Sequence, residues 1–161
     1  MSHHRLIGFA GHQSLTPETC TLVRAELRSL LSQEANLVGV TSLAAGADHI
    51  FARVVLDLNG RIVAVIPAKR YEESFGSPRD LATFRDLLAQ ADSVVEMPFD
   101  EPSEEAYWAA GQEIIRRAER MLAVWDGKPA AGLGGTADVV RLARSHGKPV
   151  TIIWPDGAAR S

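Results

Sequence analysis

Short apolar runs alternate with longer amphipathic segments along the whole chain. The apolar runs are rich in β-branched residues and predict six strands, at 5–10, 37–43, 61–67, 93–98, 121–126 and 149–154. The segments between them carry apolar residues at helical spacing and predict helices over 17–35, 47–58, 78–91, 103–118 and 136–146. This alternation is typical of a mainly parallel sheet with helices on both faces. The sequence therefore predicts a doubly wound α/β fold that forms a single domain over residues 1–161.

Three segments fall outside this alternation. Residues 68–79 form the one long connection, and their charge and Gly-Ser-Pro content predict a surface loop, with a lid as one interpretation. Residues 1–4 and 155–161 have no periodic pattern, so we predict that both are flexible ends. His3 and His4 lie in the first of these ends, and we interpret them as solvated rather than metal-binding.

Composition and charge narrow the classes of function. The formal net charge of -3 and the pI near 5.9 argue against a non-specific DNA- or RNA-binding protein, because such a protein needs a basic face. Cys20 is the only cysteine, which excludes an internal disulfide and favours a reducing, cytoplasmic location. No apolar stretch has the length of a signal peptide or a membrane helix, so no membrane partner is predicted. The histidines lack metal-ligand spacing, and we predict no metal and no cofactor.

Glycines and polar side chains collect where the predicted strands end. In a parallel sheet these ends share one edge, and ligands bind where the strand order reverses. Gly11 follows the first strand, Gly46 follows the second, and a turn with Gly134, Gly135 and Thr136 precedes the last helix. Glycine permits close backbone approach, and the free amides of a helix's first turn point toward an anion. We predict a phosphate on the amides of the last three residues; the alternative is that these glycines only turn the chain.

Two common phosphate motifs are absent. Each Gly-Lys pair is followed by proline rather than by a hydroxyl residue, so the Walker pattern is not present. The first strand supplies only Gly8 and Gly11, which falls short of the Gly-x-Gly-x-x-Gly dinucleotide fingerprint. The predicted phosphate site therefore depends on the glycine turn before the last helix.

The stretch from Glu119 to Trp154, ERMLAVWDGKPAAGLGGTADVVRLARSHGKPVTIIW, resembles the closing half of proteins of the SLOG superfamily. This Rossmann-like superfamily includes the cytokinin-activating phosphoribohydrolases of the LOG family and DNA-processing protein A. The stretch is also similar to nucleoside 2-deoxyribosyltransferases. In these groups a glycine-threonine turn opens a helix and a GKPV sequence starts the next strand. The segments GFAGH and SLAAGADHIFARVVL extend the resemblance over nearly the whole chain. It implies a Rossmann-like fold and a nucleotide or nucleoside ligand.

The chain departs from these enzymes at one position. The phosphoribohydrolases carry Pro-Gly-Gly-x-Gly-Thr-x-x-Glu, with a glutamate three residues after the threonine, and the transferases place a carboxylate nucleophile similarly. Val139 stands at that position here. The neighbouring carboxylate is Asp138, but a shift of one residue on a helix turns a side chain by about 100°. Asp138 is the candidate catalytic residue only if the turn is remodelled, and the sequence resembles a binding site more than an enzyme.

Four other side chains are candidate ligand contacts. His12 ends the first strand, where it is suited to donate to a phosphate or to act as an acid or base. Asp126 and Asp48 follow the fifth and second strands and are placed to hold sugar hydroxyls; a turn role and a favourable helix N-terminus are the respective alternatives. Tyr71 lies in the long loop, where its ring would stack on a base unless the loop is simply solvated.

These residues together predict a module that binds a nucleotide or nucleoside phosphate as a sensor or carrier. The alternative is a hydrolase or transferase that acts on an N-glycosidic bond. A carrier of flavin or molybdenum cofactor on the same fold is a third possibility. The apolar and aromatic segment 104–115, EEAYWAAGQEII, adds a prediction of self-association into a homo-oligomer.

Overall fold

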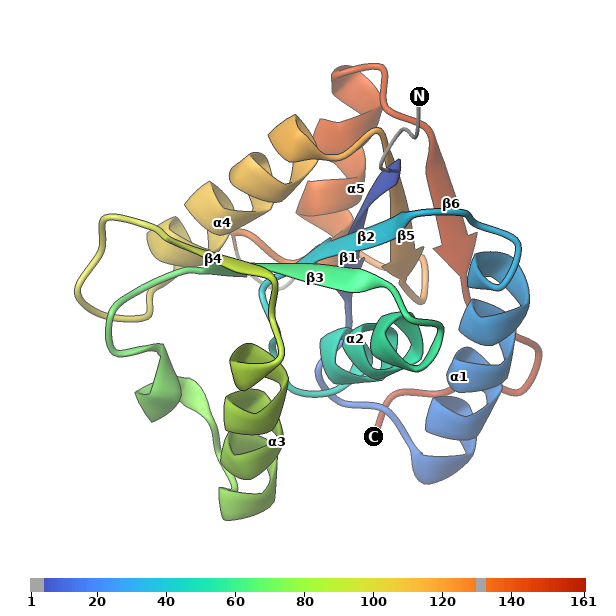
Figure 1. Cartoon of the computed structure of the whole chain (residues 1–161), viewed down its shortest axis with the longest axis horizontal. Coiled ribbons are helices and arrows are strands. Elements are labelled where there is room, and N and C mark those ends of the chain that lie inside the picture. The colour runs from blue at the N-terminus through green and yellow to red at the C-terminus, as the bar shows by residue number, and fades with distance from the viewer. Residues whose placement is uncertain (1–4, 130–132) are drawn as a thin grey trace.

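A computed structural model describes residues 5–129 and 133–161, in which helices cover both faces of a six-stranded sheet (Figure 1). The strands are β1 (Arg5–Gly11), β2 (Leu37–Thr41), β3 (Arg61–Ile66), β4 (Ser93–Glu96), β5 (Arg120–Val124) and β6 (Val150–Ile153). All pairings are parallel, in the order β4-β3-β2-β1-β5-β6. The chain builds outward from β1 to β4 and then returns to place β5 on the other side of β1. The strand order therefore reverses between β1 and β5, and the predicted doubly wound fold is confirmed.

The five helices form the outer layers. They are α1 (Pro17–Leu31), α2 (Ala47–Asp57), α3 (Pro78–Ala89), α4 (Glu104–Arg117) and α5 (Thr136–Ser145). Helices α1, α2 and α3 cover one face of the sheet, and α4 and α5 cover the other (Figure 1). Helix α1 ends at Leu31, before the predicted residue 35, and Asn36, with a φ of 55°, turns the chain into β2. No helix in the described part of the chain is long and apolar enough to cross a membrane.

Local sequence signals explain where three of the helices begin. The hydroxyl groups of Thr16, Ser77 and Ser103 each accept a hydrogen bond from the amide three residues later, at 3.1–3.2 Å. Pro17 and Pro78 then occupy the first positions of α1 and α3, where no amide hydrogen is needed. Helices α2 and α5 differ, because glycine precedes each of them and no side chain caps their amides.

Each face of the sheet has its own hydrophobic core. On one face, Leu27 of α1 and Phe84 of α3 pack with Phe51 of α2, which stacks on Phe9 of β1. On the other face, the core includes Ile114 of α4 together with apolar residues of β2, β3 and α5. Strands β2 and β3 are buried on both sides, as expected for the middle of a parallel sheet.

The C-terminal segment 155–161, predicted to be flexible, folds back along the start of α1. The carbonyl of Ala159 accepts a hydrogen bond from the amide of Thr16 at 3.2 Å, and the amide of Ala159 donates to the Thr19 hydroxyl at 2.8 Å. The Ser161 amide donates to the carbonyl of Ser14 at 3.4 Å. This segment therefore lies at the carboxyl edge of the sheet. His3 and His4 lie outside the described residues.

The long connection 68–79 contains a short 3-10 helix, η1 (Tyr71–Ser74). Its charged side chains are exposed, but Tyr71 is only 3% exposed and packs edge-on against Phe75 and Phe84. The amides of Lys69 and Arg70 donate to carbonyls of the segment after β4. The connection is thus a surface loop, as predicted, with one aromatic side chain anchored in the core.

Candidate functional site

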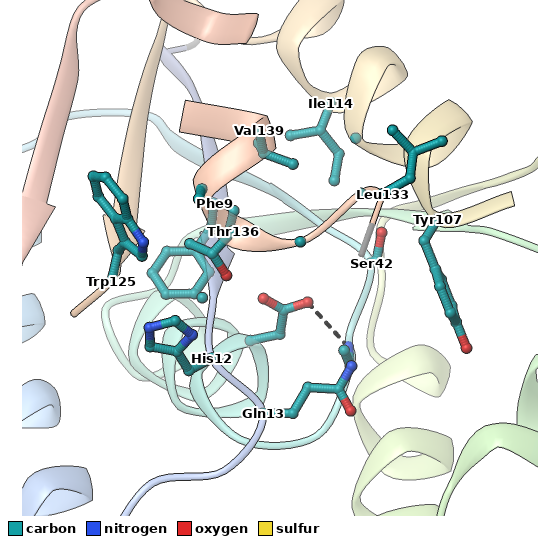
Figure 2. Close-up of a pocket in the computed structure, with 18 of the residues that line it drawn as sticks. Phe9, His12, Gln13, Ser42, Tyr107, Ile114, Trp125, Leu133, Thr136 and Val139 are labelled. Atoms are coloured by element: carbon teal, nitrogen blue, oxygen red, sulfur yellow. Dashed lines mark hydrogen bonds between the residues drawn. The ribbon is translucent and has the colours of Figure 1, made fainter. Parts of the chain in front are cut away.

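A cavity of about 430 Å³ lies at the carboxyl edge of the sheet, where the strand order reverses. Its walls come from the ends of β1, β2, β3 and β5, from α4 and from the start of α5. Figure 2 shows His12 and Gln13 on one side of it and Thr136 and Val139 on the other. Doubly wound folds bind ligands at this place, and the volume is typical of a small-molecule site.

The first turn of α5 presents backbone amides to the cavity. Within the described chain, the amides of Thr136 and Ala137 donate to no protein acceptor, and both residues line the cavity, whereas Gly135 closes the turn over Leu133 and Gly134. The amide of Gly134, in contrast, donates to Oδ2 of Asp138 at 3.2 Å. In the described chain, the amides free for an anion therefore begin two residues later than the sequence predicts, at Thr136, and include Ala137.

Asp138 does not line the cavity. Its Oδ2 accepts from Gly134, and its Oδ1 lies 3.6 Å from Nη1 of Arg141 on the outer face of α5. Val139, which stands where the related enzymes carry glutamate, lines the cavity with an apolar side chain and is 6% exposed. The turn does not bring the neighbouring carboxylate to the position of the missing glutamate.

His12 and Asp126 lie together beside the cavity. The amide of Asp126 donates to Nε2 of His12 at 3.0 Å, and Oδ1 of Asp126 is 3.3 Å from the same nitrogen. Only His12 lines the cavity. Asp126 instead accepts from the Lys128 amide at 2.9 Å and lies 3.7 Å from Nη1 of Arg160. Asp126 therefore orients its neighbours rather than facing a sugar.

The charges around this pair set its ionisation. Burial and the nearby Arg160 lower the pKa of His12, and Asp126 only partly offsets them, so His12 is neutral at pH 7 with Nε2 as an acceptor. Burial opposes the ionisation of Asp126, but the Lys128 amide, His12 and Arg160 together lower its pKa below the ordinary value. The pair thus comprises a neutral imidazole and a carboxylate.

Asp48, in the first turn of α2, is the one acidic residue among the described residues that line the cavity. It is 6% exposed, and its Oδ2 accepts from the Ala44 amide at 3.1 Å. Burial raises the pKa of Asp48 to about 7, although hydrogen bonds from Ala44 and Thr41 act in the opposite direction. A carboxyl group in this state is poised between its two forms at neutral pH.

Three other residues were predicted to contact a ligand, and two of them line the cavity while the third lies outside its lining. Gly11 and Tyr71 line the cavity. Tyr71 is fixed by its aromatic neighbours and is therefore not free to close over a ligand as a mobile lid residue. Gly46 lies outside the lining, where its φ of 80° makes the turn into α2, and a side chain there would collide with the backbone of Gln13.

The sequence analysis missed two cationic side chains that line the cavity, Lys128 and Arg160. Lys128 follows β5, and its carbonyl accepts from Nε1 of Trp125 at 2.8 Å. Its position between the fifth strand and the glycine turn was a usable signal. Arg160 gave no such signal, because only the folding back of the C-terminal segment brings it here. In the described chain, no group of three or more His, Cys, Asp or Glu residues is arranged to hold a metal.

A smaller cavity of about 170 Å³ adjoins the first one. The two share Gln13, Ser14, Ala44, Tyr71 and Tyr107, so they lie next to each other, and together we call them the groove. The groove runs from the start of α5, past the ends of β1 and β2, to η1. Its cationic side chains lie at the α5 end.

No protein-family model matches the chain, and no curated protein matches its sequence. Solved structures do match. DNA processing protein A from Streptococcus pneumoniae superposes with a TM-score of 0.72 at 17% identity, over 96% of this chain and 52% of that one. The chain thus spans about half of the pneumococcal protein. DNA processing protein A from Helicobacter pylori gives 0.68 at 18% identity, over 97% of this chain and 68% of that one. The molybdenum cofactor binding protein from Rippkaea orientalis gives 0.63 at 18% identity, over 97% and 80%.

The chain shares its Rossmann-like fold with these proteins. This confirms the resemblance seen in the sequence at the level of the fold, and ligand binding in general fits the fold's known examples.

One prediction must be corrected. The net charge of -3 predicts no non-specific nucleic-acid binding, yet the Helicobacter protein, which has this fold, is described by its single-stranded DNA binding mode. Net charge sums over the whole surface, whereas binding depends on the local distribution of charge. The exclusion therefore does not hold.

Proposed function

We propose that this chain binds a nucleotide or nucleoside phosphate at the carboxyl edge of its sheet, as a sensing or carrier module. The observation that carries the proposal is the start of α5, where the amides of Thr136 and Ala137, which have no acceptor in the described chain, line a cavity that also includes Lys128 and Arg160. Free amides at a helix N-terminus and nearby cations are the two components of a phosphate site. The aromatic residues Phe9, Tyr71, Tyr107 and Trp125 line the same cavity and supply an apolar surface for a base.

Two observations favour binding over cleavage of an N-glycosidic bond. Val139 gives the cavity an apolar wall where a catalytic carboxylate is required, and Asp138 is engaged outside the cavity. A carboxylate near the anomeric carbon is needed to stabilise an oxocarbenium-like transition state. Two of the similar structures are described by binding, one of molybdenum cofactor and one of single-stranded DNA, which supports a binding role for this fold.

The test is calorimetry with the four ribonucleoside monophosphates, the corresponding nucleosides and a short single-stranded DNA, followed by chromatography for free base. Binding of a monophosphate, weak binding of its nucleoside and no release of base are expected. Release of base above the buffer rate would establish the enzyme instead. Tight binding of the oligonucleotide alone would show that the phosphate belongs to a nucleic-acid strand. The cytoplasmic location and the self-association through the segment 104–115 stay predictions.

A further inference from the structure

Asp48 lies at a defined distance from the phosphate site. The strand order β2-β1-β5 places β1 between the end of β2, which leads to Asp48, and the end of β5, which leads to α5. Neighbouring strands are about 4.8 Å apart, so the ends of β2 and β5 are separated by two spacings, or roughly 10 Å in total. A phosphate bound at α5 would place its ribose near the end of β1, which the start of α2 also contacts through the Ala47 amide, while the Asp48 carboxyl bonds Thr41 at the end of β2. The distance between these strand ends suits the far edge of a base.

The surroundings of Asp48 are those of a base rather than a sugar. Tyr71 and Tyr107 line the cavity at this end, and their rings meet edge to face with centroids 6.4 Å apart. Tyr71 is close enough to Asp48 for the carboxylate to raise the pKa of the phenol, after burial as the main cause. Phe9 forms a further aromatic part of the wall. Aromatic side chains with one buried polar group are typical of sites that read a planar ring.

The partners of Asp48 show that its carboxyl group acts as an acceptor. The Ala44 amide donates to Oδ2. The Thr41 hydroxyl accepts from the Leu43 amide at 3.1 Å, so its own hydrogen is free to be donated, and it also bonds Asp48. Both neighbours therefore stabilise the carboxylate form. A ligand that completes this set must bring hydrogen-bond donors.

We propose that Asp48 accepts hydrogen bonds from the N1–H and 2-amino groups of a guanine, so that the bound ligand is a guanosine phosphate. The inference rests on the proposed function and names the base. Guanine presents two parallel N–H donors on one edge, which match the two oxygens of a carboxylate. Adenine, cytosine and uracil each place an acceptor in that edge, and an acceptor facing a carboxylate is repelled.

The experiment compares guanosine, inosine and 2′-deoxyguanosine monophosphates by calorimetry at pH 8. Inosine monophosphate differs from the guanosine ligand only by the missing 2-amino group. Each ligand is measured with wild type, with Asp48→Asn and with Asp86→Asn. Asp86 is an exposed residue paired with Arg53 on the surface, and it provides the same change from carboxylate to amide away from the groove. Circular dichroism and thermal melting establish that each variant is folded.

Wild type and Asp86→Asn are expected to prefer the guanosine over the inosine ligand by roughly tenfold or more, because the buried carboxylate loses one charge-assisted hydrogen bond when the 2-amino group is missing. In Asp48→Asn the preference falls to about threefold or less, since an amide carries one acceptor oxygen in place of two. Equal binding of both ligands to wild type overturns the assignment of guanine and leaves nucleotide binding intact. Loss of affinity for the 2′-deoxy ligand, without loss for inosine, shows that Asp48 holds ribose and also overturns it. Failure of every nucleotide to bind wild type is a failure of the proposed function itself.

Discussion

Asp48 has an energetic cost that its position in the cavity explains. Burial raises the pKa of Asp48 from the ordinary 3.8 to about 7, so the folded protein holds this proton more tightly than the unfolded chain does. The stabilising contribution is complete below pH 4, and it is lost as the pH rises through 7. Keeping an ionisable group at this buried position is explained by a role in ligand binding, since it adds nothing to stability at pH 8.

We expect the free energy of unfolding of wild type, relative to Asp48→Asn, to fall between pH 4 and pH 8. A pKa difference from 3.8 to about 7 corresponds to at most roughly 4 kcal/mol. Urea unfolding at several pH values measures the difference, and titrations of other groups cancel between the two proteins. A difference that does not vary with pH would show that Asp48 ionises normally in the folded state.

Asp138 is expected to contribute to stability and not to ligand affinity. Its carboxylate accepts from the Gly134 amide and faces Arg141, outside the cavity. Replacement by asparagine keeps a weaker acceptor at the same place and should lower the free energy of unfolding by about 0.5–1.5 kcal/mol. Ligand affinity, measured by calorimetry, should change less than threefold. Wild-type turnover of a nucleotide that disappears in Asp138→Asn, with the ligand still bound, would contradict the binding function.

At the scale of elements, the start of α5 is the part of the fold that offers an anion site. Thr136 is the first residue of the helix, where proline is tolerated, and Gly135 before it has the extended backbone (φ -71°, ψ 171°) that a following proline requires. Thr136→Pro therefore removes one free amide hydrogen while keeping the helix start, and Thr136→Ala keeps the amide as a matched control. We expect the proline variant to bind a nucleoside monophosphate about tenfold more weakly than the alanine variant, because one hydrogen bond to a charged group is lost. Equal affinities would show that this amide does not contact the phosphate.

The turn into α2 is a second element whose geometry depends on glycine. Gly46 has a φ of 80° and packs against the backbone of Gln13, whereas Gly147 has a φ of 70° with open space around it. Gly76 has neither constraint. Alanine substitution should cost about 1 kcal/mol at Gly147 through strain alone and roughly 3 kcal/mol or more at Gly46 through strain and collision.

Alanine at Gly76 provides the control for this series, with an expected effect within about 0.5 kcal/mol. The free energies of unfolding come from urea titration of the three variants. A cost at Gly46 no larger than at Gly147 would show that the loop of Gln13 moves away freely, and that the wall of the cavity is soft.

At the scale of the whole molecule, ligand binding should appear as stability. A nucleotide held only by the folded state at 100 times its Kd raises the free energy of unfolding by about 2.7 kcal/mol. For a chain of 161 residues this corresponds to an increase in Tm of about 5 to 10 °C. The matching nucleoside at the same concentration should give a clearly smaller shift, because the α5 amides and Lys128 then lack an anion. Equal shifts would place the phosphate outside the site.

The sequence by itself determined the helices, the strands and their arrangement in layers. The spacing of apolar residues, the capping residues of helices and the glycines at strand ends are all set by residues that are neighbours in the sequence. The runs that became β2 and β3 and the caps at Thr16, Ser77 and Ser103 are local in this sense. The alternation does not specify the strand order, and the structure places the switch point between β1 and β5, where His12 and the glycine turn line one cavity.

Only the tertiary structure decided which polar groups face the cavity. Asp126 and Asp138 follow glycine-rich strand ends as Asp48 does, but both point to protein partners, while Asp48 points to the cavity. Arg160 reaches the site from a segment with no periodic pattern. Side-chain direction and the docking of a chain end depend on contacts between residues far apart in sequence. No local pattern records them, because their energies exist only after the sheet has formed.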